Sequence, residues 1–220
     1  MNQPSNCHIV VLISGSGSNL QALIDASTSS NFKISTVISN NQEAYGLRRA
    51  EKYNIPVRII NHRAFKTRED FDLALRKAID EINPNLIVLA GFMRILGSNF
   101  VSYFAGRILN IHPSLLPKYP GINTHQRVLD DGGQEHGVTV HFVTEALDGG
   151  PIIAQEKVSV LDKDTSSILA ARVLEKEHII YPKVVTWFAA GRLHMRGSQA
   201  ILDNELLPPT GVLMKYETIP

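Results

Sequence analysis

Short apolar runs that alternate with helical patterns constrain the fold of this chain more than any other feature. The runs of the first half are HIVVLIS (8–14), ISTVIS (34–39), PVRII (56–60) and NLIVLAG (85–91). Their nearly continuous apolar character is typical of buried parallel strands, and parallel neighbours need right-handed crossover connections. The pattern therefore predicts an α/β fold, with a doubly wound, mostly parallel twisted sheet and helices on both faces.

The clearest helical pattern begins at Thr67, which together with Asp70 resembles a capping box. It ends at Asn83–Pro84, because proline cannot continue a helix. The residues that share one apolar face in between are Phe71, Leu75, Ala78, Ile79 and Ile82. We therefore expect a helix between these two ends.

The apolar runs of the second half lie at 107–111, 137–143 and 152–160. They predict three more strands, and a long helix is expected from about Thr165 to Phe188, with Gly191 as its stop. The expected core face of this helix consists of Ile168, Ala171, Val173 or Leu174, and Ile179. The last twenty residues have weak periodicity and three prolines, so we expect a surface strand or loop with a loose end.

The composition is typical of a compact domain that binds small molecules. The chain has 220 residues, of which 44% are apolar, enough for a sizeable core. Its 22 basic and 21 acidic residues leave a net charge of +1, so no nucleic-acid or membrane partner is expected. No apolar run approaches the roughly 18 residues of a membrane span. Cys7 is the only cysteine, which excludes an internal disulfide and favours a reducing compartment, the cytoplasm.

The first predicted strand meets the first helix at a turn of Gly15, Ser16, Gly17, Ser18 and Asn19. Free backbone N–H groups and the positive end of a helix dipole make such a turn suitable for phosphate. The turn is not a dinucleotide fingerprint, because position 20 is leucine and no acidic residue ends the second strand. It also lacks the Gly-Lys-Ser/Thr of a nucleotide-triphosphate loop. The alternative is a tight turn that Ser or Asn side chains cap, without a ligand.

The segment NIHPSLLPKYPG (110–121) ends an apolar strand on a histidine that a proline follows at once. His112 thereby lies at the carboxyl edge of the predicted sheet, where open α/β sheets bind ligands. Asn110 lies two residues earlier, so both side chains point to one face and could reach one reacting carbonyl. Asp148, in the glycine turn of LDGGP, is the acidic group that could orient the histidine. Taken alone, each feature has a plain alternative, a structural histidine and a simple turn.

The other candidate positions have weaker signals. His136 and His141 lack the spacing of a helical zinc pair, and no His-Glu-x-x-His sequence supports them, so no metal is expected. Thr139 and His141 share one face of their strand, and His141 is either a satisfied strand histidine or a functional one. The segment FMRIL (92–96) is either ordinary core or the wall of an apolar ligand slot.

Six segments occur in order over about residues 8–195: VVLISGSGSNLQALIDA, VLAGFMRIL, LNIHPSLLPKYPG, HGVTVHFV, LDGGPII and EKEHIIYP. Together they resemble one family, the 10-formyltetrahydrofolate-dependent phosphoribosylglycinamide formyltransferases of purine biosynthesis. The resemblance implies transfer of a formyl group from 10-formyltetrahydrofolate, a co-substrate, to the primary amine of 5'-phosphoribosylglycinamide. The products would be N-formyl phosphoribosylglycinamide and tetrahydrofolate, and no metal is implied.

The resemblance also implies roles for particular residues. Asn110, His112 and Asp148 would be catalytic: the amide stabilises a tetrahedral oxyanion, the imidazolium adds charge and assists proton movement, and the carboxylate orients the ring. The contacts to the ribonucleotide would come from Gly15, Ser16, Gly17, Ser18, Asn19 and Glu177. The contacts to the folate would come from Arg68, Met93, Arg94, Ile95, Leu96, Val143, Thr144 and Asp148.

On this resemblance, residues 1–200 form a single formyltransferase domain with a Rossmann-like N-terminal half. The phosphate-binding half covers about 1–105, the catalytic and folate-binding half 106–200, and a C-terminal tail 201–220. The protein would be a monomer or a homodimer whose partners are small molecules. Two alternatives stay open. One is another 10-formyltetrahydrofolate enzyme of the same fold, a hydrolase or an enzyme with a different acceptor, and the other is a non-catalytic phosphate-binding module.

Overall fold

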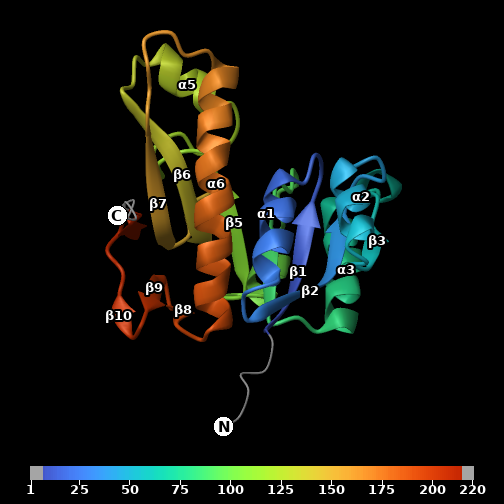
Figure 1. Cartoon of the computed structure of the whole chain (residues 1–220). Helices are drawn as coiled ribbons and strands as arrows, with labels where there is room; N and C mark the ends of the chain where they lie inside the picture. The colour runs from blue at the N-terminus through green and yellow to red at the C-terminus, as the bar shows by residue number, and fades with distance from the viewer. Residues whose placement is uncertain (1–6, 215–220) are drawn as a thin grey trace.

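An eight-stranded mixed sheet organises the computed structural model, which describes residues 7–214 (Figure 1). Its order is β11-β7-β6-β5-β4-β1-β2-β3. The strands are β1 (Cys7–Ile13), β2 (Phe32–Ser39), β3 (Val57–Ile59), β4 (Leu86–Leu89), β5 (Ile108–His112), β6 (Glu135–Phe142), β7 (Ile152–Ser159) and β11 (Val212–Leu213). Pairing is parallel from β3 through β5, antiparallel between β5, β6 and β7, and parallel between β7 and β11. This confirms the predicted mostly parallel α/β sheet.

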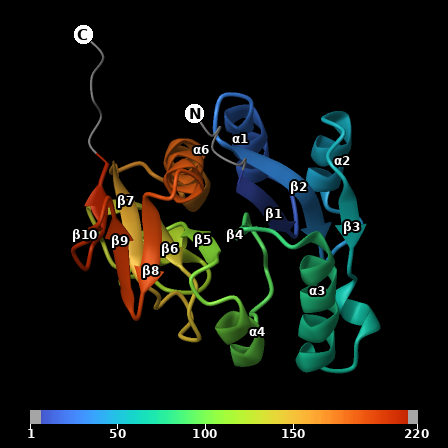
Figure 2. The ribbon, with the colours of Figure 1, turned by 90° about the horizontal axis from the view of Figure 1, so that it is seen from below.

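Helices cover both faces of the sheet, as Figure 2 shows from below. They are α1 (Ser18–Ser27), α2 (Tyr45–Lys52), α3 (Arg68–Ile82), α4 (Ser98–Tyr103), α5 (Thr124–Asp130) and α6 (Ser166–Ala189), with a short 3-10 helix, η1 (His62–Ala64). One core cluster holds residues of α1, α2 and α6, and the other holds residues of α3 and α4. Alternate residues of β1 enter the two clusters, with Ile9 and Val11 in the first and Val10 and Leu12 in the second. Both faces of β1 are therefore buried, as its continuous apolar run predicts.

The helix predicted after Thr67 is confirmed at both ends. The Thr67 side chain accepts a hydrogen bond of 3.1 Å from the backbone N–H of Asp70, which caps α3. Asn83 ends the helix in a left-handed conformation, with φ at 49°.

The long helix α6 is confirmed, but the expected core face was wrong. Ile168, Ala171 and Ile179 are exposed, and of the expected residues only Val173 is buried. The residues buried along α6 are Leu169, Val173, Glu177, Ile180, Tyr181, Pro182, Val184, Val185 and Trp187. Apolar residues occur on two sides of this helix, and the buried side includes the Glu177 carboxylate. Hydrophobic periodicity alone therefore predicted the wrong face as buried.

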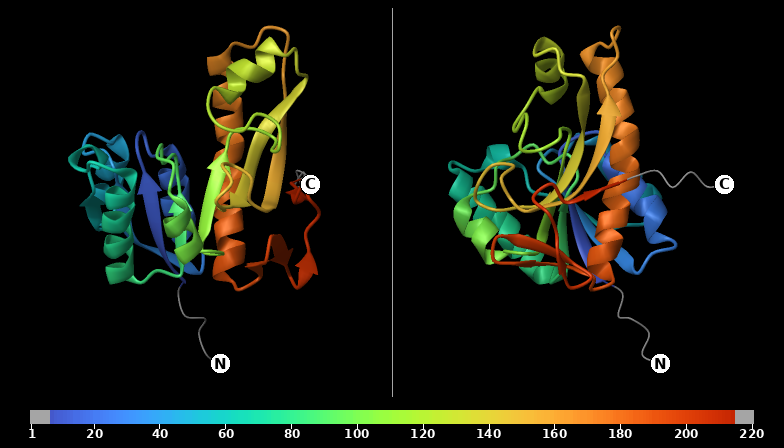
Figure 3. Two further views of the ribbon diagram at one scale, coloured as in Figure 1. Left: turned by 180° about the vertical axis from the view of Figure 1, so that it is seen from behind. Right: turned by 90° about the vertical axis from the view of Figure 1, so that its left-hand side faces the viewer.

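The C-terminal part of the described chain adds strands at the end of α6 (Figure 3). A second, three-stranded sheet contains β8 (Leu193–Arg196), β9 (Gln199–Leu202) and β10 (Glu205–Leu206). β11 then pairs with β7, where Val212 lies opposite Ala154. Residues 201–214 of the expected tail thus contribute an edge strand to the main sheet. Within residues 7–214, no helix is long and apolar enough to cross a membrane.

Candidate active site

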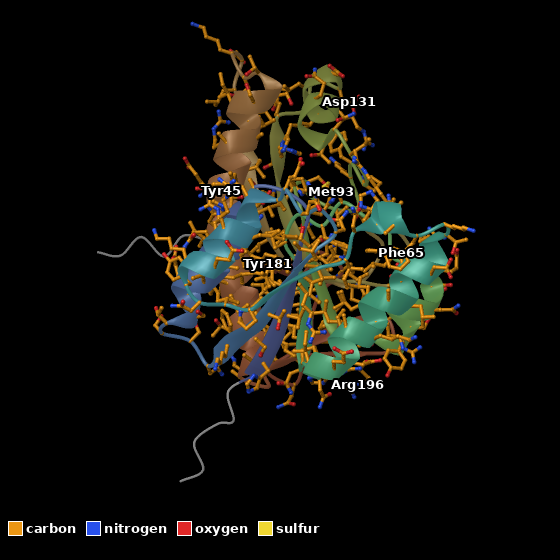
Figure 4. The ribbon with its side chains drawn as sticks, turned by 90° about the vertical axis from the view of Figure 1, so that its right-hand side faces the viewer. Tyr45, Phe65, Met93, Asp131, Tyr181 and Arg196 are labelled. Carbon is orange, nitrogen blue, oxygen red and sulfur yellow. The ribbon has the colours of Figure 1, made fainter. Side chains whose placement is uncertain are left out.

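The predicted site residues gather at the carboxyl edge of the parallel strands. The turn after β1 and the loop after β4 meet there, because the Ser14 N–H donates to the Gly91 carbonyl at 3.2 Å. A cavity of about 210 Å³ lies at this edge, lined by residues 14–19 of the turn and by Ala90, Gly91 and Met93. Met93 stands at this edge in Figure 4. A larger cavity, of about 550 Å³, includes His8 and Lys33 at the opposite end of the strands and contains none of the predicted site residues.

The structure brings Asn110, His112 and Asp148 together. Asn110 and His112 lie two residues apart on β5, and Nδ1 of His112 is 3.5 Å from Oδ2 of Asp148. The side chains of His112 and Asp148 are 7% and 8% exposed, so the pair is shielded from water. Asp148 adopts a φ of 49°, and a side chain at Gly150 would clash with the Phe142 carbonyl. The Asp-Gly-Gly turn is therefore a tight, strained turn that holds the carboxylate against the histidine.

Both ring nitrogens of His112 face acceptor atoms. Nε2 is 2.9 Å from the Tyr119 carbonyl, which can only accept, so this nitrogen carries a proton. Nδ1 faces the Asp148 carboxylate. The same carboxylate oxygen also accepts the Gly121 N–H at 2.8 Å. The Tyr119 carbonyl and the Asp148 carboxylate can therefore each accept an N–H of the His112 ring.

The proline-rich loop after β5 is anchored by polar side chains of the two antiparallel strands. Thr139 donates to the Ser114 carbonyl at 2.6 Å and accepts the Leu116 N–H at 3.0 Å. Gln155 donates to the Leu116 carbonyl at 2.8 Å and to the Thr139 hydroxyl at 2.9 Å. Thr139 is thus a structural residue, and its hydrogen bonds help to place the loop segment whose Tyr119 carbonyl contacts His112.

The glycine-rich turn leaves the start of α1 without a side-chain cap. Gly17 is the N-cap residue, with φ at 70°, and no side-chain hydrogen bond caps the helix. The alternative of a Ser- or Asn-capped turn is therefore wrong. A Cβ at Gly17 would lie 2.6 Å from the Cα of Gly46, so the turn also needs glycine for close packing. Arg49 braces the turn by donating to the Ser16 carbonyl at 3.0 Å.

A buried amide and carboxylate lie next to the turn. The Asn19 amide donates to Oε2 of Glu177 at 2.6 Å, and the two residues are 7% and 8% exposed. Burial raises the pKa of the Glu177 carboxyl, and the hydrogen bond from Asn19 opposes that shift. Oδ1 of Asn19 and Nε2 of His178 are two of the five described buried side-chain atoms that have no hydrogen-bond partner. A ligand hydroxyl could therefore form hydrogen bonds with these atoms.

The loop after β4 carries half of the residues expected to contact a folate. Met93 and Ile95 are 72% and 58% exposed, and the Met93 N–H donates to the Ser14 hydroxyl at 2.8 Å. Leu96 is partly buried against the second core cluster, and so is Val143 just after β6. The exposed apolar side chains beside the carboxyl edge fit a flat, largely apolar ligand ring.

A buried carboxylate fixes the end of this loop. Asp72 of α3 accepts the Gly97 N–H at 2.7 Å. Burial raises the pKa of the Asp72 carboxyl, and the charges of Arg68 and Arg94 act to lower it. Arg68 and Arg94 thus lie close enough to Asp72 for their charges to act on it. Thr144 lies beside the Asp148 turn, because its methyl group would be 3.2 Å from a Cβ at Gly150.

Sequence reasoning missed several participants that have no local signal. The Tyr119 carbonyl and the Gly121 N–H contact the catalytic candidates through backbone atoms, which any residue would supply. Ser14 links the turn to the loop after β4 through its hydroxyl. The ring nitrogens of His125 and His136 are 3.0 Å apart, and residues 7–214 contain no group of three side chains that could hold a metal ion.

Known proteins resemble this chain over most of its length. Residues 7–185 match the family model described as formyl transferase. The phosphoribosylglycinamide formyltransferase of Escherichia coli (strain K12) is 53% identical over 206 residues, which cover 93% of this chain and 97% of that protein. The trifunctional purine biosynthetic protein adenosine-3 of Homo sapiens is 45% identical over 88% of this chain and 19% of that protein.

Solved structures show the same similarity. The phosphoribosylglycinamide formyltransferase of Coxiella burnetii, in complex with CHES, superposes with a TM-score of 0.91 at 53% identity, covering 95% of this chain and 99% of that one. A formyltetrahydrofolate deformylase from Pseudomonas syringae superposes with a TM-score of 0.82 at 24% identity, which shows a shared fold alone. The match to the family model and the identity to these relatives extend over most of the described chain, so this chain belongs to the formyl transferase family.

Proposed function

We infer that this chain is a phosphoribosylglycinamide formyltransferase of purine biosynthesis. It transfers the formyl group of 10-formyltetrahydrofolate to the primary amine of 5'-phosphoribosylglycinamide and releases tetrahydrofolate. The family membership supports this reaction, and two bacterial relatives with that name are 53% and 48% identical over more than nine-tenths of this chain. The observation that carries the mechanism is the buried contact of 3.5 Å between His112 and Asp148, beside Asn110.

The catalytic roles follow from the charges and donors at this contact. The substrate amine forms a bond to the formyl carbon, whose bond to N10 of the folate then breaks, and a proton moves from the amine to N10. Asn110 donates a hydrogen bond to the oxyanion formed on the way, and the His112 imidazolium stabilises the same charge. Asp148 holds the ring in place and balances its charge. The residues supply preorganised charge and proton movement, and no covalent enzyme intermediate is needed.

The ribonucleotide is proposed to bind at the glycine-rich turn. Gly15, Ser16, Gly17 and Ser18 present backbone N–H groups at the uncapped start of α1, where the helix dipole favours an anion. Asn19 and Glu177 lie together on the same side of the site, and the free acceptor of Asn19 suits a ribose hydroxyl. The phosphate would thus be held at the turn, with the glycinamide amine directed toward Asn110 and His112.

The folate is proposed to bind between the loop after β4 and the segment after β6. The loop supplies Met93, Arg94, Ile95 and Leu96, and the segment supplies Val143, Thr144 and Asp148. The exposed apolar side chains at 93 and 95 fit the pterin ring, and the cation of Arg68 at the start of α3 fits the carboxylates of the glutamate tail. 10-Formyltetrahydrofolate is a co-substrate, which gives up its formyl group and leaves as tetrahydrofolate after each turnover.

The remaining assignments are proposals of the same kind. Residues 1–200 act as one formyltransferase domain, with phosphate binding in about 1–105, catalysis and folate binding in 106–200, and a tail after 200. A single buried cysteine is consistent with work in the reducing cytoplasm. The net charge of +1 gives no electrostatic attraction for nucleic acid. The protein acts on small molecules as a monomer or a homodimer.

A formyl-transfer assay with three acceptors tests this function. The appearance of tetrahydrofolate from 10-formyltetrahydrofolate is followed with phosphoribosylglycinamide, with unphosphorylated glycinamide riboside, and with water alone. Fast transfer to the ribonucleotide and slow transfer to the riboside are expected, because the turn after β1 binds the phosphate. Equal turnover with water alone would identify a hydrolase, and an absence of turnover would leave the non-catalytic phosphate-binding module.

A further inference from the structure

His141 is a buried titratable group at the site that the mechanism above does not use. It lies directly opposite Asn110 in the antiparallel pair of β5 and β6, and it is 2% exposed. Its Nε2 is 3.2 Å from the amide nitrogen of Asn110, and its Nδ1 is 2.9 Å from the Phe142 carbonyl. Cross-strand neighbours at this separation interact directly.

The surroundings of His141 fix the position of its proton. The Phe142 carbonyl can only accept, so Nδ1 carries the proton. Burial lowers the pKa of His141 to about 4, and the charge of His112 also lowers it. The Phe142 hydrogen bond and the Asp148 carboxylate, which lies 3.9 Å from Nε2, act in the opposite direction but do not outweigh burial. The ring is therefore neutral at physiological pH, and Nε2 presents a lone pair to Asn110.

A lone pair on Nε2 allows only one orientation of the Asn110 amide. With the NH₂ group toward His141, one N–H makes a hydrogen bond; with the amide turned over, two acceptor atoms face each other. We propose that His141 is a positioning residue: it holds the Asn110 amide so that its second N–H is directed at the oxygen of the reacting formyl group. This inference rests on the proposed function, because it assigns a role in the same formyl transfer.

The consequence is specific to the transition state. If the acceptor on His141 is lost, the Asn110 amide can turn over and present its oxygen to the developing oxyanion, which repels it. Loss of a single preorganised oxyanion donor lowers kcat by roughly 10²–10³-fold in other enzymes. Partial loss of its orientation should therefore lower kcat by about 10-fold or more, with KM for both substrates changed by less than about 2-fold, because ground-state binding does not use this bond.

Two amide variants separate this role from simple packing. In His141→Gln the terminal amide reaches the position of Nε2, so its oxygen can accept from Asn110, and kcat is expected to stay within about 3-fold of wild type. In His141→Asn the shorter amide reaches only the position of Nδ1, so the Phe142 contact is kept, the acceptor is lost, and the larger loss of kcat is expected. Similar losses in both variants would overturn the proposal.

A double-mutant cycle with Asn110→Ala gives the second test. If His141 acts through Asn110, adding His141→Asn to Asn110→Ala changes kcat by less than about 2-fold, because the group that it positions is already gone. If the two losses multiply, His141 acts independently of Asn110 and the proposal is wrong. The unfolding transition of each variant is measured as well, so that loss of folded protein is not counted as loss of kcat.

The tautomer of His141 can be read without any turnover. In ¹⁵N NMR of the folded protein at neutral pH, the His141 signals should show a protonated Nδ1 and an unprotonated Nε2. An imidazolium signal, or a proton on Nε2, would overturn the proposal. Because this spectrum needs no substrate, it tests the inference even where wild-type protein fails to formylate phosphoribosylglycinamide, a result that would instead refute the proposed function.

Discussion

Acid should destabilise this protein through two buried histidines, His136 and His141. Burial lowers the pKa of each ring from 6.5 to about 4, and for His136 the nearby rings of His125 and His112 act in the same direction. Between these two pH values the unfolded chain binds a proton at each position and the folded chain does not. The stability is therefore full above about pH 6.5 and is lost progressively as the pH falls toward 4.

The size of this effect follows from the two pKa shifts. Over that window each histidine lowers the free energy of unfolding by about 1.4 kcal/mol per pH unit. Between pH 7.5 and pH 5, only the part below pH 6.5 contributes, which is about 1.5 pH units. Protonation of each ring in the unfolded chain therefore lowers the free energy of unfolding by about 2 kcal/mol, and protonation of both rings by about 4 kcal/mol. Domains of this kind are stable by about 5–15 kcal/mol, so the loss is a large share of the total.

Urea unfolding followed by circular dichroism at several pH values between about 7.5 and 5 measures this loss. His136→Gln removes one of the two titrating rings, so its free energy of unfolding should fall by about 2 kcal/mol less than that of wild type over the same range. His194→Gln on β8 is the matched control, because that ring is exposed. If wild type and His136→Gln lose the same free energy, the buried ring does not resist protonation and the reasoning is refuted.

Three further substitutions test the site and the core. His112→Ala should lower kcat by about 100-fold or more in the formyl-transfer assay with little change in KM, because the imidazolium acts on the transition state; unchanged kcat would refute its catalytic role. Gly17→Ala should raise KM for phosphoribosylglycinamide and lower the unfolding temperature, because residue 17 has a φ of 70° and its new Cβ would lie 2.6 Å from the Cα of Gly46. Unchanged values would show that the turn needs no glycine. Tyr181→Phe should cost about 1–3 kcal/mol in urea unfolding, because its hydroxyl lies 2.9 and 3.1 Å from two buried strand carbonyls; a loss near zero would show that those carbonyls do not need it.

The features that the sequence predicted well are those with local causes. The parallel strands are continuous apolar runs, and the cap of α3 needs only Thr67 and Asp70 three residues apart. The spacing of Asn110 and His112 places both on one face of β5 without any knowledge of the neighbours. The buried face of α6 could not be predicted in this way, because it is defined by what packs against it and it includes Glu177, which hydrophobicity assigns to the surface.

The partners of the catalytic candidates depend instead on strand register. Asn110 meets His141, and His112 meets Thr139, because β6 runs antiparallel to β5 in one particular alignment. A shift of one residue would place Val140 or Phe142 opposite Asn110, since side chains alternate across a strand, and the amide would lose its acceptor. The sequence presents His141 as a polar residue in an apolar strand, which fits both a structural and a functional histidine. Only the register distinguishes the two, because it places the lone pair of a neutral ring against the one amide whose orientation the proposed chemistry requires.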